Sequence, residues 1–405
     1  MATHINSESI IETAACPVCG SINQQTLYRH NKQTGTTLGE IEVVVGQCDD
    51  CGFVYNSRRL RSAVISDYYF SSSVASGQTY RDEDSQAYYP SLHKTRARFL
   101  SGFLNSQLSG SLLDIGCGVG GFLGAMSHEL NGDWQCLGIE PSMEASRLAR
   151  INGFRVKTTM LAGDIFTPHS IDAISLVSVL EHLSDLHQAL KSVTELLKSD
   201  GIVFIEVPNL LLPELSLTGF FSPEHIQHFT PGSLFALLHR YGLSEIITDR
   251  SVTDKVIRIV ASARMAGWST ADLVTYSDDS TEACQAVKEY TTREERLLTE
   301  LNYNVTAALV RWQRRNCTIA IYGAGVHTAE LLGHFDLHAV CSIVIDGDPK
   351  KQGTTYLGFP VYSPEQILEL GINAILISSH RFQDEIINKI RQVAGERVEI
   401  ALCYE

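Results

Sequence analysis

The stretch LLDIGCGVGGFL, residues 112–123, joins an apolar run to a glycine-rich turn and then to a second apolar run. The residues before Asp114 are typical of a buried strand, which ends at that acid. Glycines at alternate positions, Gly116, Gly118 and Gly120, allow the backbone to approach a ligand closely. We therefore predict a strand, a binding loop and a helix in this order.

A second acid follows this loop at the distance that nucleoside-binding sheets use. The run QCLGIE, residues 135–140, predicts the next strand, and Glu140 ends it about twenty residues past the loop. An acid in that place binds the hydroxyl pair of a ribose. The loop and the two acids together predict an adenosine-containing ligand, and both NAD and S-adenosylmethionine satisfy this geometry.

The alternation of strand and helix patterns continues on both sides of these motifs. The runs 171–179 (IDAISLVSV) and 201–207 (GIVFIEV) predict further buried strands, so residues of about 90–265 are expected to form an α/β parallel sheet. Residues from about 275 to 315 have helical spacing and few helix breakers, which predicts one long helix. The stretch 317–335 (CTIAIYGAGVHTAELLGHF) begins a second, smaller α/β unit.

Four of the ten cysteines form two Cys-x-x-Cys pairs near the N-terminus, Cys16 with Cys19 and Cys48 with Cys51. Each pair is followed by a glycine, which permits the tight turn that directs both sulfurs at one ion. Four thiolates leave no open coordination position. The spacing therefore predicts a structural zinc site in a small β module.

The overall composition favours a protein that acts on a small molecule. Subtracting 46 acidic from 32 basic residues gives a net charge of −14, and no dense Lys/Arg run is present to follow a phosphate backbone. Nucleic acid and anionic membranes are therefore poor partner hypotheses. The N-terminus lacks a signal-peptide pattern, and no window approaches eighteen apolar residues, so we expect a cytoplasmic protein.

The glycine loop, the sequence GIEPS (138–142) and the sequence SVLEHL (178–183) resemble, in this order and spacing, the class I S-adenosylmethionine-dependent methyltransferases. This resemblance favours S-adenosylmethionine over NAD. By it, Asp114 and the loop contact the amino-acid part of the cofactor, Glu140 the ribose, and the backbone near Ser178 the methionine side. The residues that it assigns to the cofactor are Asp114, Gly116, Cys117, Gly118, Gly120, Glu140, Pro141, Ser178 and Leu180.

The order of the whole chain is similar to that of the zinc-binding deoxysugar C-methyltransferases, which methylate a nucleotide-linked keto sugar. DYYFSSS (67–73) and PEHIQHF (223–229) resemble two segments of that family. The resemblance implies that His225 removes the proton next to the keto group, with Glu224 and Tyr69 in support.

These residue types suit the chemistry without the resemblance. A carbon nucleophile requires removal of a proton α to a carbonyl, and a histidine titrates near neutrality. Glu224 can orient His225, and a tyrosine can bind the enolate oxygen. Three alternatives stay open: O- or N-methylation of a sugar or other small metabolite, a scaffold that binds cofactor without turnover, and a purely structural segment in which His228 is the core residue.

The C-terminal unit has its own glycine turn, at Gly323 and Gly325, followed by His327 and by Asp346 at the end of the next strand. A helix N-terminus beside such a turn favours phosphate. We hypothesise that this unit binds the nucleotide carrier of the substrate; the alternative is a domain that only packs or oligomerises. The expected organisation is a zinc module (1–65), a methyltransferase core (66–270), a helical linker (271–315) and a Rossmann-like domain (316–405).

Overall fold

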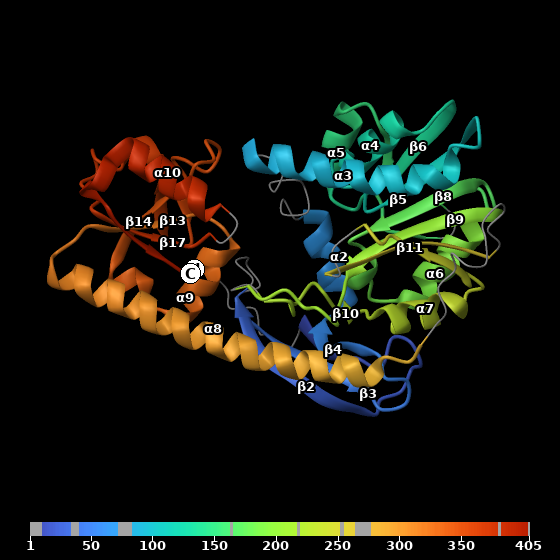
Figure 1. The fold of residues 1–405 in the computed structure, drawn as a ribbon, viewed down its shortest axis with the longest axis horizontal. Helices are drawn as coiled ribbons and strands as arrows, with labels where there is room; N and C mark the ends of the chain where they lie inside the picture. Colours follow the sequence, from blue (N-terminus) through green and yellow to red (C-terminus); the bar gives the residue numbers. More distant parts are fainter. Residues whose placement is uncertain are drawn as a thin grey trace.

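The computed structural model describes residues 10–33, 40–71, 83–162, 165–216, 219–251, 255–263, 277–379 and 382–403. These residues form three β-sheets that follow one another along the chain. Figure 1 shows the central sheet and its helices on one side, the C-terminal sheet on the other, and the N-terminal sheet with a long helix beneath them. Residues 271–276 of the expected linker lie outside the described residues. So do residues 72–73 of the serine-rich segment.

The N-terminal sheet is antiparallel, in the order β1-β4-β3-β2. Its strands alternate β-branched and polar residues between tight turns, as small hairpins require. The second Cys-x-x-Cys pair lies in the turn between β3 and β4. The elements are β1 (Ile11–Thr13), β2 (Gln24–Gln33), β3 (Glu40–Cys48), β4 (Val54–Leu60) and the following helix α2 (Ser62–Ser71).

The central sheet has the order β11-β12-β9-β8-β5-β6-β7. All the strand runs predicted for it are confirmed, and β12 pairs antiparallel with β9 on one side and with the edge strand β11 on the other. Its strands are β5 (Ser109–Ile115), β6 (Asp133–Ile139), β7 (Arg155–Lys157), β8 (Ile171–Val177), β9 (Leu197–Pro208), β11 (Glu245–Thr248) and β12 (Val256–Ser262). Its helices are α3 (Glu83–Leu104), α4 (Gly121–Glu129), α5 (Met143–Ile151), α6 (Leu186–Leu196) and α7 (Pro231–His239), with the short 3₁₀ helix η2 (Leu180–His182) after β8.

Parallel strands bury both faces of this sheet, which explains the continuous apolar runs of its strands. Leu112 and Leu113, adjacent on β5, belong to two different core clusters on the two faces, and neither is exposed. The carboxyl ends of β5, β6, β8 and β9 lie at one edge, so the loops after them meet there.

The C-terminal sheet has the order β15-β16-β14-β13-β17-β18, parallel except for β15. This confirms a second, smaller α/β unit. Its strands are β13 (Ile319–Tyr322), β14 (Cys341–Ile345), β15 (Thr355–Tyr356), β16 (Phe359–Tyr362), β17 (Ala374–Ile377) and β18 (Glu399–Leu402). Its helices are α9 (Val326–His334), α10 (Gln383–Ala394) and the 3₁₀ turns η4 (Leu337–Ala339), η5 (Pro364–Gln366) and η6 (Gly395–Arg397).

The long helix expected before this unit is α8 (Ser280–Arg314). It runs along the N-terminal sheet and reaches the C-terminal domain (Figure 1). Tyr290 and Trp312, both fully buried, anchor its two ends, and Tyr290 donates a 3.0 Å hydrogen bond to Glu294 on the same helix. The helix therefore connects all three parts of the chain through one apolar face.

The segment 222–233 is irregular only in its first part. Residues 222–226 lie outside regular structure, Gln227–His228 form the short strand β10, which pairs with Tyr55 and Val54 of β4, and residues from Pro231 onward begin α7. A strand of the central region thus completes the N-terminal sheet, so these two parts share a sheet across the expected boundary at residue 65. The two-residue strand has no alternation of its own and depends on β4 for its pairing.

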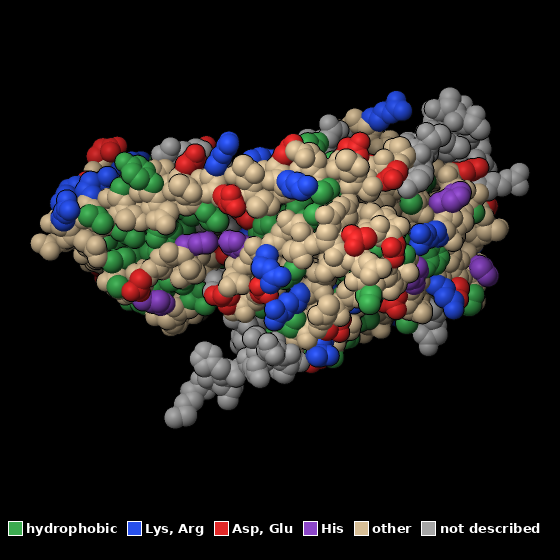
Figure 2. Space-filling model, turned by 90° about the horizontal axis from the view of Figure 1, so that it is seen from below, with side chains coloured by type: hydrophobic (Ala, Val, Ile, Leu, Met, Phe, Trp, Pro, Cys, Tyr) green, Lys and Arg blue, Asp and Glu red, His purple; other side chains and the backbone are tan. Residues whose placement is uncertain are grey.

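The surface agrees with the charge pattern of the sequence. Figure 2 shows acidic and basic side chains interspersed over the face seen from below, with no continuous basic surface on that face. Within the described residues, every helix is too short or too polar to cross a lipid bilayer.

Candidate functional site

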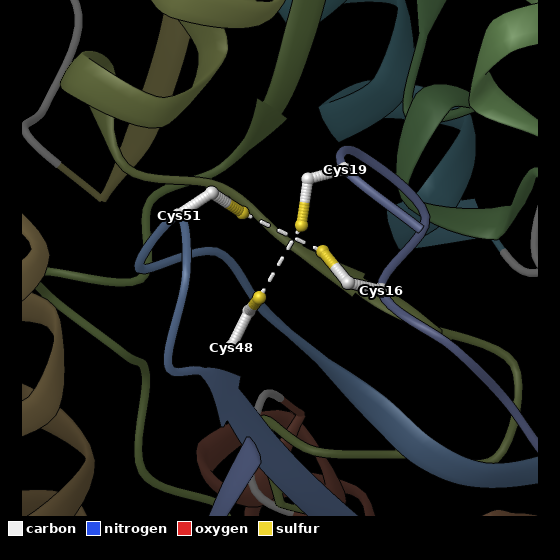
Figure 3. Close-up of side chains that lie close together, drawn as sticks. All are labelled: Cys16, Cys19, Cys48 and Cys51. Atoms are coloured by element: carbon white, nitrogen blue, oxygen red, sulfur yellow. Dashed lines mark hydrogen bonds between the residues drawn. The ribbon is translucent and has the colours of Figure 1, made fainter. Parts of the chain in front are cut away.

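The four cysteines of the N-terminal module come together as the spacing predicts. Figure 3 shows their side chains pointing at a common centre, with Cys16 and Cys51 sulfurs 3.5 Å apart and Cys19 and Cys48 sulfurs 3.4 Å apart. Gly20 and Gly52 after the pairs have φ of 77° and 73°, which only glycine adopts without strain. A Cβ on Gly52 would also lie 2.4 Å from the Cβ of Ser280. The lack of a side chain at Gly52 therefore lets α8 pack closely against the turn.

The donor set fits a zinc ion. Tetrahedral zinc with sulfur ligands at about 2.3 Å places its sulfurs about 3.8 Å apart, close to the spacing of the two contacts above. Cys16 and Cys48 are buried, and the cluster packs into the same apolar core as the central sheet. Four thiolates of this geometry are compatible with a structural metal rather than a catalytic one, because no ligand position stays open.

The glycine loop after β5 has the shape of a binding loop. Gly116, Gly118 and Gly120 all have positive φ. A Cβ on Gly116 would meet Val179 and one on Gly120 would meet Phe154, so the fold itself requires these two glycines. A Cβ on Gly118 would have no described atom within 4 Å, which leaves open space over the loop for a ligand.

Both predicted acids lie beside this loop. Glu140 accepts hydrogen bonds from the backbone N–H of Gly118 at 2.9 Å and of Ser142 at 2.8 Å, so its carboxylate is fixed at the edge of the open space. Asp114 is buried and accepts a 2.7 Å hydrogen bond from Ser175. Burial raises the pKa of Asp114 to about 7 and also raises the pKa of Glu140.

The other residues assigned to the cofactor differ in exposure and backbone conformation. Leu180 has a fully buried side chain, and the sulfur of Cys117 packs toward Gly138 in the sheet. Ser178 is exposed and has φ of 53°, a left-handed conformation that is uncommon for a residue with a side chain. Pro141 lies between Glu140 and the cap of α5.

A cluster of imidazoles lies between η2, which follows β8, and the segment just before β10. The rings of His182 and His225 are 4.7 Å apart and nearly perpendicular. Tyr69 of α2 places its hydroxyl 2.8 Å from Nδ1 of His182, and that nitrogen is also 3.0 Å from the carbonyl oxygen of Glu224. Since Val179 contacts Gly116, the cluster adjoins the glycine loop.

The protein keeps both histidines neutral near pH 7. Burial, together with the neighbouring His225, lowers the pKa of His182 to about 3, although the Glu224 carbonyl opposes this. Burial also lowers the pKa of His225, and the charge of Glu224 partly offsets the effect. A neutral imidazole has a free nitrogen lone pair, so the cluster can remove a proton from a bound molecule.

Glu181 is a buried carboxyl group beside the two histidines. Its oxygens have no hydrogen-bond partner among the described residues, and Nε2 of His182 lies 3.9 Å away. Burial raises its pKa to about 8, so the group is protonated near neutral pH. Potential ligand atoms of Glu181, His182 and His225 all lie within 4.8 Å of one another, so this group also has the spacing of a metal site.

His228 is the core residue of the segment 222–233. It is 3% exposed, its ring is 4.8 Å from that of Phe221, and its Nε2 is 2.9 Å from Oδ1 of Asn56. Burial, with a smaller contribution from His225, lowers its pKa to about 3. Since its ring is enclosed, His225 and not His228 is available to a ligand.

In the C-terminal domain, the carboxylate of Asp346 accepts backbone hydrogen bonds in the same pattern as that of Glu140. Asp346, at the end of β14, accepts a 2.7 Å hydrogen bond from the N–H of Ala324 and a 2.8 Å bond from that of Asp348. Gly323 has φ of 116°, and α9 begins directly after Gly325. His327 lies half-buried in the first turn of α9.

SVLEHL was interpreted only as a cofactor motif, so its contribution to the histidine cluster was not predicted. A signal was present, because the chain has Glu-His pairs at 181–182 and 224–225, one after each of two strand runs. The carboxyl ends of adjacent parallel strands meet at one edge of a sheet. That rule brings the pairs together only if the two strands are known to be neighbours.

Two family models match successive parts of the chain. Residues 86–247 match a methyltransferase domain, and residues 257–402 match a C-methyltransferase C-terminal domain.

The chain spans less than two thirds of the length of the curated relatives that it matches. The C-methyltransferase NovU of Streptomyces niveus is 25% identical over 272 residues, which span 63% of this chain and 64% of that protein. The ubiquinone biosynthesis O-methyltransferase of Vibrio cholerae is 28% identical over 105 residues, or 24% of this chain and 42% of that protein.

Two solved methyltransferases have a similar fold over nearly half of the chain. The magnesium protoporphyrin IX methyltransferase of Synechocystis is 15% identical, with a TM-score of 0.37 and coverage of 49% and 94% of the two chains. The CurJ carbon methyltransferase is 18% identical, with a TM-score of 0.36 and coverage of 46% and 57%.

Proposed function

Because this chain belongs to the class I S-adenosylmethionine-dependent methyltransferases, we propose that it methylates a carbon atom of a nucleotide-linked keto-deoxysugar. The observation that carries the proposal is the pair of neutral, half-buried imidazoles beside the glycine loop. A carbon acid requires a base of this kind, and the C-methyltransferase C-terminal domain agrees with a carbon acceptor.

In this proposal each residue of the cluster has one task. His225 takes the proton from the carbon next to the keto group, which leaves an enolate. Tyr69, with its hydroxyl held by His182, donates a hydrogen bond to the enolate oxygen. Glu224 orients His225, and its negative charge favours the protonated imidazole that results.

The residues around the glycine loop would hold the methyl donor. S-adenosylmethionine, when bound, would supply the electrophilic methyl group for the enolate carbon, and its sulfonium would become a neutral thioether. Asp114 would hold its amino group, Glu140 its ribose hydroxyls, and the backbone at Gly118 and Ser178 would lie against it.

The proposal is tested by incubating the wild-type protein with S-adenosylmethionine and a panel of nucleotide-linked 4-keto-6-deoxysugars in deuterated water. Mass spectrometry follows the gain of a methyl group, and the same sugars without cofactor report deuterium exchange at the α carbon. Methylation together with exchange supports the proposal. Methylation without exchange would indicate an oxygen or nitrogen acceptor, as in the O-methyltransferase relative.

The cofactor affinity is expected to increase with pH through about 7. Asp114 has a raised pKa of about 7, so it is mostly neutral at pH 6 and mostly ionised at pH 7.5. Only the ionised carboxylate attracts the ammonium group of the cofactor. We expect the Kd for S-adenosylmethionine to be about tenfold higher at pH 6 than at pH 7.5 in calorimetry. In Asp114→Asn binding should be weak at both pH values, and an unchanged pH dependence in this variant would assign the titration to another group.

We assign the nucleotide carrier of the substrate to the C-terminal domain, at Gly323, Gly325, His327 and Asp346. The support is the similarity of Asp346 to Glu140, since each carboxylate accepts a loop N–H and the N–H two residues later. Asp346→Asn is expected to raise the KM for the nucleotide sugar about tenfold and to leave the KM for S-adenosylmethionine unchanged. Glu365→Gln, at an exposed ion pair of the same domain, is the control. Equal KM values in Asp346→Asn and wild type would refute this assignment.

A further inference from the structure

The segment that carries His225 is held on one side by a single asparagine of β4. Asn56 donates a hydrogen bond from Nδ2 to the carbonyl of Ser222 at 2.9 Å. Its backbone N–H donates to the carbonyl of Ile226, also at 2.9 Å. Its Oδ1 lies 2.9 Å from Nε2 of His228. Asn56 therefore contacts the segment before, within and after its turn.

The orientation of this amide is determined by its partners. A carbonyl oxygen can only accept, so the atom facing Ser222 must be the NH₂ group, and the oxygen must face His228. The neutral His228 then carries its proton on Nε2 and donates to Asn56. Since Asn56 is 1% exposed, water does not compete for these bonds.

The opposite side of the segment rests on η2 and the residue after it. The N–H of Ile226 donates to the carbonyl of Glu181 at 2.9 Å, and the side chain of Gln227 donates to that of Leu183 at 2.9 Å. His225 itself donates its N–H to the hydroxyl of Ser222 at 3.1 Å. The segment is thus clamped between Asn56 and the strand end that carries His182.

Asn56 lies on the strand that begins shortly after the second pair of cysteines. Gly52 donates its N–H to the carbonyl of Cys48 at 2.9 Å, and Cys48 donates its own to Phe53 at 2.9 Å. The strand β4 begins at the next residue, and its Val54 and Tyr55 pair with His228 and Gln227. The turn that holds Cys48 and Cys51 therefore sets the start of the strand that holds the segment.

We propose that Asn56 is a positioning residue that fixes the proton-accepting geometry of His225, and that the four-cysteine module serves catalysis through it. This inference rests on the proposed function for its kinetic part only. A displaced base loses rate steeply with distance, whereas the cofactor loop lies on other strands and is unaffected.

The test compares Asn56→Ala with Ser57→Ala. Ser57 is the next residue on β4, is equally buried, and bonds to Val44 within the N-terminal sheet, away from the His225 segment. Asn56→Ala is expected to lower α-deuterium exchange and kcat about 10²-fold, with unchanged zinc content and S-adenosylmethionine affinity. Ser57→Ala should keep the wild-type rate. Equal exchange in Asn56→Ala and wild type would overturn the proposal.

Two further measurements keep the inference testable if Asn56→Ala folds poorly or no substrate is found. Asn56→Asp preserves size and the acceptor for His228 but cannot donate to Ser222, so an intermediate loss of exchange is expected. Amide hydrogen exchange of residues 222–228 needs no substrate: protection should fall in Asn56→Ala and persist in Ser57→Ala. Unchanged protection in Asn56→Ala would show that Asn56 does not hold the segment, whatever reaction the enzyme performs.

Discussion

Replacement of His225 by alanine is expected to reduce α-deuterium exchange and methyl transfer by about 10²–10⁴-fold. The variant loses the neutral imidazole that accepts the proton, and His182 cannot substitute, because Tyr69 and the Glu224 carbonyl engage its Nδ1 and Nε2 faces the protonated Glu181. The Kd for S-adenosylmethionine in calorimetry should stay at its wild-type value, because the residues around the glycine loop are unchanged.

His239→Ala is the matched control, since His239 lies exposed in the last turn of α7. It should leave both rates unchanged. A second variant, His182→Gln, separates the two imidazoles of the cluster: it is expected to slow methyl transfer less than His225→Ala, because His182 acts through Tyr69. If His182→Gln abolishes exchange while His225→Ala retains it, the roles of the two histidines are reversed.

The cofactor side of this site could be predicted from sequence because its determinants are local. Gly116 to Gly120 and Asp114 belong to one strand-loop-helix unit, and Glu140 ends the next strand. A local pattern of this kind is readable from spacing alone. The zinc site could be predicted equally well, because each cysteine pair forms its turn within a few residues and tetrahedral coordination determines how the two pairs meet.

The acid–base side depends on contacts that spacing does not encode. His225 was identified by resemblance, but its neighbour His182 lies forty-three positions earlier, and the two meet where the backbone of Ile226 bonds to that of Glu181. Asn56 gave no signal at all. A single buried asparagine between a strand and a distant loop is recognised only when both partners are in place.

The buried ion pairs of the central sheet could not be predicted from the sequence either. Glu206 of β9 forms ion pairs with Arg96 of α3 and Arg258 of β12, and Arg258 also contacts Asp249 at 2.9 Å. Burial opposes the ionised carboxylate, yet the two arginines hold the pKa of Glu206 below its usual value. A charged residue within an apolar run suggests an exposed edge, and only the packed partners show that it lies in the core.

Replacement of Cys51 by serine is expected to release the zinc ion and to lower the melting temperature of the protein. Serine is a poor zinc ligand, and the binding free energy of a structural zinc site contributes directly to folding. Metal analysis should find about one zinc per chain in the wild type and a large loss in the variant. Cys284→Ser, which removes a partly exposed thiol of α8 outside the cluster, should retain the metal and the melting temperature.

The Cys51→Ser variant also separates proton removal by His225 from the binding of S-adenosylmethionine. Cys51 precedes β4, and β4 holds the His225 segment through Asn56, so α-deuterium exchange should fall with the loss of zinc. The glycine loop lies between β5 and α4; Glu140 accepts a hydrogen bond from the loop at Gly118, and Asp114 accepts one from Ser175 of β8. S-adenosylmethionine binding should therefore survive at temperatures where the variant is folded. If zinc loss leaves both exchange and the melting temperature unchanged, the metal neither stabilises the N-terminal sheet nor positions the base.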